Sequence, residues 1–309
     1  MKVITLTLSP AFDMHCSLKS FEPCHENLAD VTALEAGGKG VNISRALASL
    51  GIDSYPAIVI GDENGTDFKR ALSADGLMPI YIDVKGRIRQ NITLHSADDP
   101  ETRISFRGFS VDIDFFDRVY LAIENVIDED TVLTFTGSLP EGASTDSAVA
   151  LLSKVKAKGA KIVVDSRSFS LDNVKAVHPW LIKPNEEEIS LYYNREVTDL
   201  ESAAIAASEL RSKLSDNVMI SLGALGAVLA SEGGTFMAKA PKAKVVSTVG
   251  AGDSMIAGFI AAAKKGLDYR EALKFAVSMG SAACMTEGTR PPKKENVEAL
   301  FREVKVKNA

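Results

Sequence analysis

A carboxylate stands just behind two glycines where a helix is expected to begin. The segment is Thr248-Val249-Gly250-Ala251-Gly252-Asp253-Ser254, and the apolar run that follows it predicts the helix. Backbone N–H groups at a helix N-terminus lack an intrahelical partner and carry partial positive charge, so they can receive phosphate oxygens. Asp253 could take a proton from an attacking hydroxyl, which suits phosphoryl transfer. An Asp N-cap after a glycine-rich turn is the alternative interpretation.

A second glycine cluster, Gly37-Gly38-Lys39-Gly40-Val41-Asn42, runs into another predicted helix. It is not a Walker A loop, because Lys39 is followed by Gly40 instead of Ser or Thr, and it lacks the dinucleotide-binding fingerprint. A backbone without side chains lets a small polar ligand approach closely, and Asn42 offers both a donor and an acceptor to hydroxyl groups. A simple strand-to-helix turn would explain the same glycines.

Polar residues also follow two predicted strands. Asp13 comes after the first strand, at the end where an α/β protein places its ligand crevice, and its carboxylate could accept hydrogen bonds from two sugar hydroxyls. Ser138 lies in the same kind of position beyond a later strand. Asp13 alone is equally well explained as a solvated turn residue.

Arg89 and Arg103 stand on two segments of alternating polarity in an acidic chain. A guanidinium group matches phosphate oxygens bidentately, so both are candidates for holding a phosphate that the substrate already carries. The alternative is a pair of ordinary solvated strand arginines.

The stretch from Lys183 to Glu188 places a proline and three carboxylates at a predicted helix start, which helix initiation alone would explain. Asn185 and Glu188, three residues apart, would nevertheless share one face and could hold a water-clad Mg²⁺ beside nucleotide phosphates. The segment 221–226 closes another strand with a turn that could border an adenine ring. It could equally be a plain hairpin.

Short β-rich runs alternate with longer helical ones, which is typical of the α/β class: a mostly parallel sheet with helices on both faces, in three layers. The glycines at 51 and 159 are expected to end helices over Val41–Leu50 and Thr145–Lys158, and the chain from Gly252 onward is expected to be helical throughout. Strands are expected at Val3–Leu8, Ala57–Ile60, Val132–Phe135, Lys161–Val164, Trp180–Lys183, Val218–Ser221 and Ala227–Ala230.

Two regions, Asp13–Leu34 and Ile88–Phe109, interrupt this order. The second alternates in polarity, which indicates strands with one face uncovered by helices. We expect both regions to form a small sheet that projects from the body and covers a cleft or pairs with another subunit. The body would then comprise residues 1–12, 35–87 and 110–309, and this lid residues 13–34 and 88–109.

The composition of the 309 residues, 46% hydrophobic and 25% charged, predicts one compact body with a small appendage. A net charge of −6 argues against a nucleic-acid surface, and the longest apolar stretch, Met255–Ala263, is too short to span a membrane. Three cysteines form neither a metal-binding spacing nor an even disulfide framework. A reducing cytoplasm is therefore the expected compartment.

Taken together, the two glycine clusters, the 183–188 stretch and Ser221-Leu222-Gly223 resemble the ribokinase-like PfkB carbohydrate kinases in order and spacing. The resemblance extends from the first strand to about Gly288-Thr289-Arg290. Within that family the chain is similar to the phosphosugar branch, which includes 1-phosphofructokinase, tagatose-6-phosphate kinase and the minor 6-phosphofructokinase. The residues that carry this likeness are Asp13, Gly37-Gly38-Lys39-Gly40, Arg89, Arg103 and Gly137-Ser138-Leu139-Pro140.

The resemblance implies a ribokinase-like fold and ATP-dependent phosphorylation of a primary hydroxyl. We expect fructose 1-phosphate to be converted to fructose 1,6-bisphosphate, with tagatose 6-phosphate and fructose 6-phosphate as alternative substrates. It also implies Mg²⁺ and a homodimer formed through the lid. The implied roles are Asp253 as base with an anion hole at Gly250, Ala251 and Gly252; sugar contacts from Asp13, Gly38, Lys39 and Asn42; phosphate contacts from Arg89, Arg103 and Ser138; nucleotide contacts from Lys183, Asn185, Ser221, Gly223, Gly226 and Thr248; and Mg²⁺ near Asn185 and Glu188.

One departure from the family concerns the lid. Relatives commonly carry a basic residue shortly before the glycine cluster, where this chain has Glu26, Asn27 and Leu28, so one expected phosphate contact is missing. A kinase of an unphosphorylated sugar or nucleoside is a rival hypothesis, but it would leave Arg89 and Arg103 without a ligand. A sugar- or nucleotide-binding regulatory protein on the same scaffold is a rival from outside the enzymes.

Overall fold

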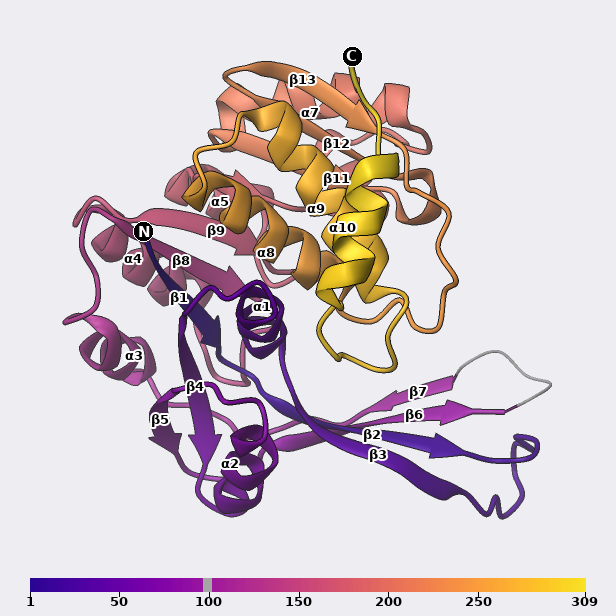
Figure 1. Ribbon diagram of the computed structural model, residues 1–309. Helices are drawn as coiled ribbons and strands as arrows, with labels where there is room; N and C mark the ends of the chain where they lie inside the picture. Colours follow the sequence, from indigo (N-terminus) through magenta and orange to yellow (C-terminus); the bar gives the residue numbers. More distant parts are fainter. Residues whose placement is uncertain (97–101) are drawn as a thin grey trace.

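A ten-stranded sheet forms the centre of the molecule in a computed structural model that describes residues 1–96 and 102–309 (Figure 1). Residues 97–101 of the expected lid therefore lie outside the described residues. The sheet is parallel from β5 to β11, and its last three strands are antiparallel. In spatial order the strands are β14 (Val306–Asn308), β13 (Gly234–Ala238), β12 (Ala227–Ser231), β11 (Asn217–Ser221), β10 (Leu181–Ile182), β9 (Lys161–Asp165), β8 (Thr131–Thr136), β1 (Lys2–Thr7), β4 (Tyr55–Gly61) and β5 (Ile80–Val84).

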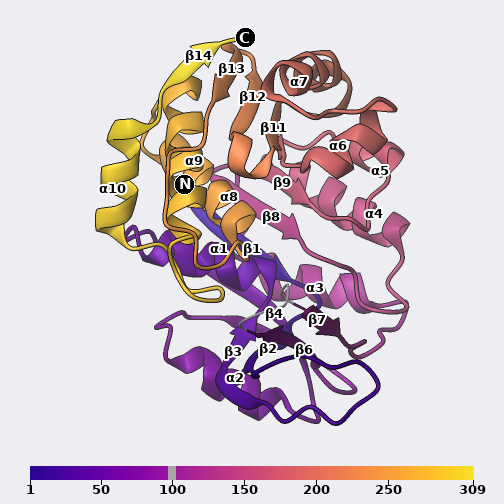
Figure 2. The same cartoon turned by 90° about the vertical axis from the view of Figure 1, so that its right-hand side faces the viewer.

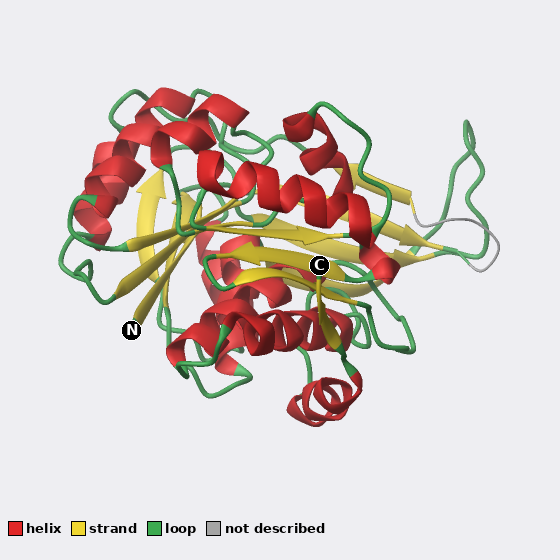
Figure 3. Cartoon of the chain, turned by 90° about the horizontal axis from the view of Figure 1, so that it is seen from above, coloured by secondary structure: helices red, strands yellow, loops and turns green. Residues whose placement is uncertain are grey.

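Helices cover both faces of this sheet, which confirms the predicted fold class (Figures 2 and 3). One face carries α1 (Lys39–Ala48), α8 (Ala251–Lys264), α9 (Tyr269–Ala283) and α10 (Lys294–Glu303). The opposite face carries α3 (Phe115–Ile123), α4 (Thr145–Lys156), α5 (Leu171–Val177), α6 (Glu186–Tyr193) and α7 (Leu200–Leu214). Alternate residues of β1 point to the two cores, with Val3 in one and Ile4 in the other, because side chains of a strand alternate between faces.

All seven predicted strands are present, with ends displaced by at most two residues. The expectation of helix throughout the carboxyl third is wrong at its end, where β14 pairs with β13 and forms the edge of the sheet. Helix α1 begins two residues earlier than predicted, since Gly40 lets its first turn lie directly against the backbone of Leu6. The strands β5, β13 and β14 were not predicted.

A separate four-stranded sheet projects from the body as the expected lid (Figure 1). Its strands run in the order β3 (Asp30–Gly37), β2 (Ala11–Ser17), β6 (Arg89–His95) and β7 (Thr102–Ser105). Helix α2 (Gly65–Ser73) packs against β3 and β4 where the lid joins the body. The lid strands extend past the predicted limits: β2 begins at Ala11, before residue 13, and β3 continues past residue 34 to Gly37. The lid sheet therefore includes the first glycine of the cluster.

Strand register gives the lid two chemically different faces, because neighbouring residues of a strand point in opposite directions. One row across the sheet is polar and consists of Glu35, Asp13, Asn91 and Ser105. The adjacent row is apolar and consists of Leu34, Met14, Ile92 and Ile104. Asp13 is thereby placed on the polar face of the lid.

The carboxyl ends of β1, β8 and β9 meet at one edge of the main sheet, where parallel α/β proteins bind their ligands. Helices α1 and α8 both begin with glycine caps, at Gly38 and Gly250, that carry no side-chain cap. By contrast, side chains of Ser144, Ser170 and Asp199 cap α4, α5 and α7. In the described ranges, no helix has both the length and the apolar character needed to cross a membrane.

Candidate active site

Asp253 lies inside the first turn of α8 and is not the cap of that helix. The cap is Gly250, whose φ of 79° is a left-handed conformation that favours glycine. The buried Asp253 carboxylate instead accepts a hydrogen bond of 2.9 Å from Nδ2 of Asn42. The N-cap interpretation is therefore wrong, and the two glycine clusters meet at this hydrogen bond. In the part of the chain that the structure describes, the amides of Gly252 and Asp253 have no acceptor.

Burial raises the pKa of Asp253 to about 6. That value is the net result: burial and the negative charge of Asp165 raise the pKa of Asp253, whereas the ammonium group of Lys39, the hydrogen bond from Asn42 and the ammonium group of Lys183 lower it. A carboxylate with this pKa is largely ionised at neutral pH yet remains a better proton acceptor than an exposed aspartate. Asp253 can therefore act as a base at the N-terminus of α8.

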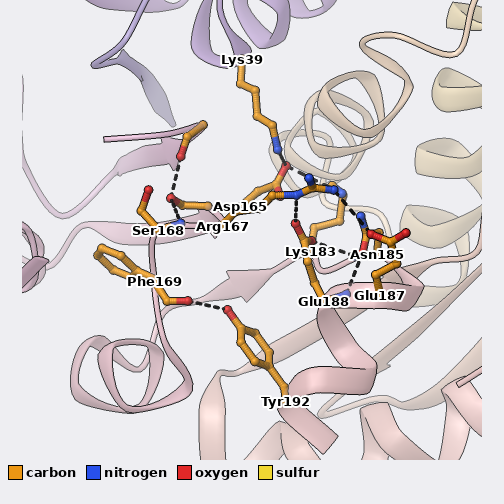
Figure 4. Close-up of polar contacts among 12 residues, drawn as sticks. Lys39, Asp165, Arg167, Ser168, Phe169, Lys183, Asn185, Glu187, Glu188 and Tyr192 are labelled. Atoms are coloured by element: carbon orange, nitrogen blue, oxygen red, sulfur yellow. Dashed lines mark hydrogen bonds and ion pairs between the residues drawn. The ribbon is translucent and has the colours of Figure 1, made fainter. Parts of the chain in front are cut away.

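Asp165, at the end of β9, forms ion pairs with two lysines (Figure 4). The charges of both lysines act on Asp253. Its Oδ2 lies 2.9 Å from Nζ of Lys39 and 3.7 Å from Nζ of Lys183. Burial favours a raised pKa for Asp165, but the ammonium groups of Lys183 and Lys39 hold it below its ordinary value. Burial also favours a lowered pKa for Lys39, and the charges of Asp165 and Asp253 outweigh it and raise that pKa.

Lys183 reaches the glycine turn of α8. A Cβ placed on Gly252 would lie 3.0 Å from Nζ of Lys183, so the ammonium group stands at the entrance to the helix. Sequence reasoning missed Asp165, although it ends a predicted strand just as Asp13 follows one. Its signal was therefore present in the chain.

A cavity of about 300 Å³ lies between the lid and the carboxyl ends of the strands. It brings together residues that are far apart in the sequence and come from β1, β2, α1, β6, β7 and α8. Those of its lining residues that the sequence singled out are Asp13, Gly38, Lys39, Asn42, Arg89, Arg103, Ser138, Lys183, Gly250, Gly252 and Asp253.

Asp13 is fixed at this cavity by the polar face of the lid. Its Oδ1 accepts a 2.7 Å hydrogen bond from Nδ2 of Asn91 and lies 3.6 Å from Nη2 of Arg103. A side chain at Gly37 would collide with the carboxylate of Asp13, so this glycine makes room for a protein group and not for a ligand. Asn91 is a cavity residue that the sequence did not reveal, because a lone Asn in a strand carries no pattern.

Arg89 and Arg103 converge on the cavity with incomplete hydrogen bonding. Arg89 makes one long contact, 3.5 Å from Nη2 to the carbonyl of Ser9, and its buried Nε has no partner among the described residues. Burial lowers the pKa of Arg89, and the second arginine lowers it further, whereas the Asp13 carboxylate opposes both. The guanidinium groups of Arg89 and Arg103 carry two positive charges, and Asp13 carries one negative charge. One positive charge is therefore available to bind an anion.

The lid residues Glu26, Asn27 and Leu28 lie in the loop between β2 and β3, and none of them lines this cavity. Leu28 is 87% exposed. In this chain, therefore, the described positive charge at the cavity comes from Arg89, Arg103 and the two lysines.

A second cavity, of about 480 Å³, lies on the other side of the α8 turn. Gly252 lines both cavities, so a single turn of backbone separates them. The hairpin from β11 through the 3-10 turn Gly223–Leu225 to β12 forms one wall, so the segment 221–226 is both a hairpin and a cavity border. Predicted residues on its lining are Ser221, Gly223, Gly226, Thr248 and Ala251.

Asn185 and Glu188 form a reciprocal cap at the start of α6. Oδ1 of Asn185 accepts from the amide of Glu188 at 2.8 Å, and Oε2 of Glu188 accepts from the amide of Asn185 at 3.0 Å. Glu188 also shares a small enclosed space with Asp165 and Lys183. Over residues 1–96 and 102–309, no group of three or more His, Cys, Asp or Glu side chains is arranged to hold a metal ion. One carboxylate and one amide oxygen fit a Mg²⁺ that keeps most of its waters and is shared with phosphates.

The chain is similar to known proteins over nearly its whole length. A family model described as pfkB family carbohydrate kinase matches residues 14–296. A Vibrio cholerae protein named 1-phosphofructokinase is 31% identical over 308 residues, covering 99% of this chain and 96% of the relative. An Escherichia coli protein of the same name is 33% identical over 281 residues, covering 91% and 89%.

The fold is also that of a solved structure. The crystal structure of phosphofructokinase-2 from Escherichia coli in complex with substrates and products is similar with a TM-score of 0.92 and 28% identity. The similarity covers 98% of this chain and 99% of that one.

We expect the Asp253→Asn variant to be more stable than the wild type at pH 7.5. Because folding raises this pKa from 3.8 to about 6, the stability that protonated Asp253 contributes is complete below pH 3.8 and lost as the pH rises through 6. Asn does not titrate, and its amide could donate to the buried Oδ1 of Asn42, which has no hydrogen-bond partner among the described residues. The gain should be about 2–3 kcal/mol at pH 7.5 and should shrink toward pH 4. Urea unfolding at a series of pH values measures it.

The matched control is Asp53→Asn, which removes the charge of an exposed carboxylate. This change should alter the free energy of unfolding by no more than about 0.5 kcal/mol at any of these pH values. A variant at position 253 that is less stable than the wild type at pH 7.5, or a gain that does not depend on pH, would contradict the assignment of a burial cost to this carboxylate.

Proposed function

The chain belongs to the PfkB family of carbohydrate kinases, and we propose that it transfers the terminal phosphoryl group of ATP to a primary hydroxyl of fructose 1-phosphate. The observation that carries this proposal is the position of Asp253 in the first turn of α8, where it lines the cavity under the lid. The neighbouring Gly252 lines both this cavity and the one behind the turn. The cavity under the lid is the proposed sugar-phosphate site, and the cavity behind the α8 turn is the proposed nucleotide site. The product would be fructose 1,6-bisphosphate.

In the proposed reaction the sugar hydroxyl lies next to Asp253, which removes its proton as the oxygen attacks phosphorus. The loose transition state of phosphoryl transfer asks the protein mainly for positioning and for stabilisation of charge. The amides of Gly250, Gly252 and Asp253 would face that charge at the helix N-terminus, and that of Ala251 would join them by giving up its 3.4 Å hydrogen bond to the carbonyl of Thr248. Lys183, whose ammonium group stands beside Gly252, adds a full positive charge at the same place.

We propose that Asn185 and Glu188 hold Mg²⁺ through its waters, as their oxygen donors allow. When bound, the ion would neutralise charge on the nucleotide phosphates. Lys183, Ser221, Gly223, Gly226 and Thr248 would contact the nucleotide, with the hairpin after β11 bordering its base.

For the sugar we propose that Asp13, Gly38, Lys39 and Asn42 bind hydroxyl groups. Arg89, Arg103 and Ser138 would hold the phosphate that the sugar already carries, because the two guanidinium groups have donors left over. The choice of fructose 1-phosphate is supported by the names of the relatives, at 31% and 33% identity.

We also propose that two copies pair through their lids. Several apolar side chains on the lid are exposed, among them Val31 at 58%, Leu34 at 51%, Ile104 at 43% and Phe106 at 49%. A contiguous apolar face of this kind on a projecting sheet is a typical contact surface between proteins. A cytoplasmic location belongs to the same proposal, since Cys16, Cys24 and Cys284 are all free thiols, as a reducing compartment permits.

The role of Asp253 as proton acceptor can be tested by substitution. Asp253→Asn should lower turnover by about 10²- to 10⁴-fold while changing the dissociation constants of sugar and nucleotide by only a few fold. Turnover of the wild type should also fall as the pH drops through about 6, because protonated Asp253 cannot accept a proton. Steady-state kinetics and calorimetric binding measure both quantities. Near-normal turnover of the variant would refute the role of Asp253.

The second prediction tests the substrate. The specificity constant should be highest for fructose 1-phosphate, lower for fructose 6-phosphate and tagatose 6-phosphate, and lowest for unphosphorylated fructose. Arg89→Ala should reduce the ratio of the specificity constant for fructose 1-phosphate to that for fructose. The reason is that the substitution removes a phosphate contact and leaves the hydroxyl contacts in place. A higher constant for another phosphosugar would change the substrate, and equal constants for fructose and its phosphate would remove the role of the arginines.

The third prediction tests the assembly. The wild type should sediment as a dimer at micromolar concentration, and Ile104→Asp should shift it toward monomer, because a charge in an apolar contact is costly to bury. Leu191→Asp, at an apolar side chain of α6 that is 80% exposed, serves as the control and should leave the dimer intact. A monomeric wild type would overturn the pairing.

A further inference from the structure

Arg167 forms an ion pair with Glu188, the carboxylate that we propose for metal binding. Nε of Arg167 donates a 3.0 Å hydrogen bond to Oε1 of Glu188, and its Nη2 lies 3.9 Å from Oε2 of Glu187 (Figure 4). The Glu188 side chain is only 18% exposed, whereas that of Arg167 is 70% exposed. The Glu188 carboxylate is therefore shielded, and the Arg167 guanidinium group approaches it from the solvent side.

Both carboxylate oxygens of Glu188 already accept a hydrogen bond from the protein. Oε2 already accepts from the amide of Asn185, and Oδ1 of Asn185 accepts from the amide of Glu188. Oε1 is the remaining oxygen, and it is the one that Arg167 holds. A divalent cation that approaches Glu188 must compete with a guanidinium group for this oxygen or displace it.

We propose that Arg167 neutralises Glu188 until nucleotide binds, and that it then exchanges this carboxylate for the phosphates of the nucleotide while Glu188 turns to the metal. Free divalent cations would thus bind weakly, and the metal would enter together with its nucleotide. This inference rests on the proposed function, because it takes the nucleotide and Mg²⁺ from it.

The position of Arg167 suits both partners. It follows Asp165 by two residues at the carboxyl end of β9, the edge of the sheet where the phosphates are expected. The N–H groups of Arg167 other than the two already named have no acceptor among the residues described. A planar guanidinium fork matches the oxygens of a phosphate, so it can pass from a carboxylate to a phosphate with little change in hydrogen bonding.

The ion pair is also weak enough to exchange. The Arg167 side chain is 70% exposed, so water screens its half of the pair, and holding this long side chain in one geometry costs conformational entropy. Glu188 still acts on its surroundings, since its charge contributes to the raised pKa values of Lys39 and Tyr192. The charge state of Glu188 therefore reaches the cluster next to Asp253.

The test uses Mn²⁺ as the probe, observed by electron paramagnetic resonance in the full-length protein without nucleotide or sugar. Arg167→Ala should bind free Mn²⁺ about two- to fivefold more tightly than the wild type, and the difference should shrink at high salt. The same variant should show a Michaelis constant for Mg–ATP that is several fold higher. A role in folding alone would not move these two affinities in opposite directions.

Two further variants sharpen the result. Arg167→Lys keeps the charge but loses the fork, so its affinity for free Mn²⁺ should stay near that of the wild type while its Michaelis constant for Mg–ATP remains raised. Arg118→Ala breaks a comparable surface pair with Asp112 and should change neither quantity.

Unchanged or weaker Mn²⁺ binding in Arg167→Ala overturns the competition for Glu188. Tighter Mn²⁺ binding with an unchanged Michaelis constant for Mg–ATP overturns the transfer to the phosphates. The Mn²⁺ measurement needs neither turnover nor a sugar. If the protein fails to phosphorylate fructose 1-phosphate, the proposed substrate fails while the result at Glu188 still stands or falls by itself.

Discussion

The hydrogen bond between Asn42 and Asp253 is the interaction on which the candidate site depends. It joins the first turns of α1 and α8, which belong to opposite ends of the sequence, and it does so beneath two glycine caps that leave backbone amides open. The carboxylate that accepts this bond is buried, and burial favours its protonated form. The surrounding structure must therefore supply enough positive charge for ionisation without removing the basicity that burial creates.

Lys39, Asp165 and Lys183 provide that balance. Two ammonium groups share one fully buried carboxylate, which leaves a net positive charge next to Asp253 before any ligand is present. Asp165 lets the two lysines approach each other and simultaneously raises the pKa of Asp253. The same logic extends outward to Glu188 and Arg167, where an acid of the cluster again carries its own counterion. In the ligand-free protein, the charges of Asp165, Asp253 and Glu188 are thus balanced by those of Lys39, Lys183 and Arg167.

Much of the fold could be predicted because buried parallel strands are short continuous apolar runs and glycines mark the ends of helices. The strands β5, β13 and β14 escaped prediction since they lie at or near the sheet edges, where partial exposure breaks the apolar pattern. Residues in glycine-rich motifs were recognisable from the chain, and the structure brings Asp13, Asn42 and Asp253 to one cavity. Asn91 and Arg167 were missed because their significance lies in partners 78 and 21 positions away, and such pairings leave no local pattern. Asp165 was missed although it follows a predicted strand, as Asp13 does.

The polar row of the lid has a consequence for how the proposed enzyme treats water. Asp13 and Arg103 belong to a sheet that projects from the body, whereas Asp253 and the open amides belong to the body itself. In the proposed site a sugar phosphate would contact both parts at once, whereas a water molecule is too small to do so. Hydrolysis of ATP would then be disfavoured by geometry, since the acceptor that connects lid and body would also be the one that receives the phosphoryl group.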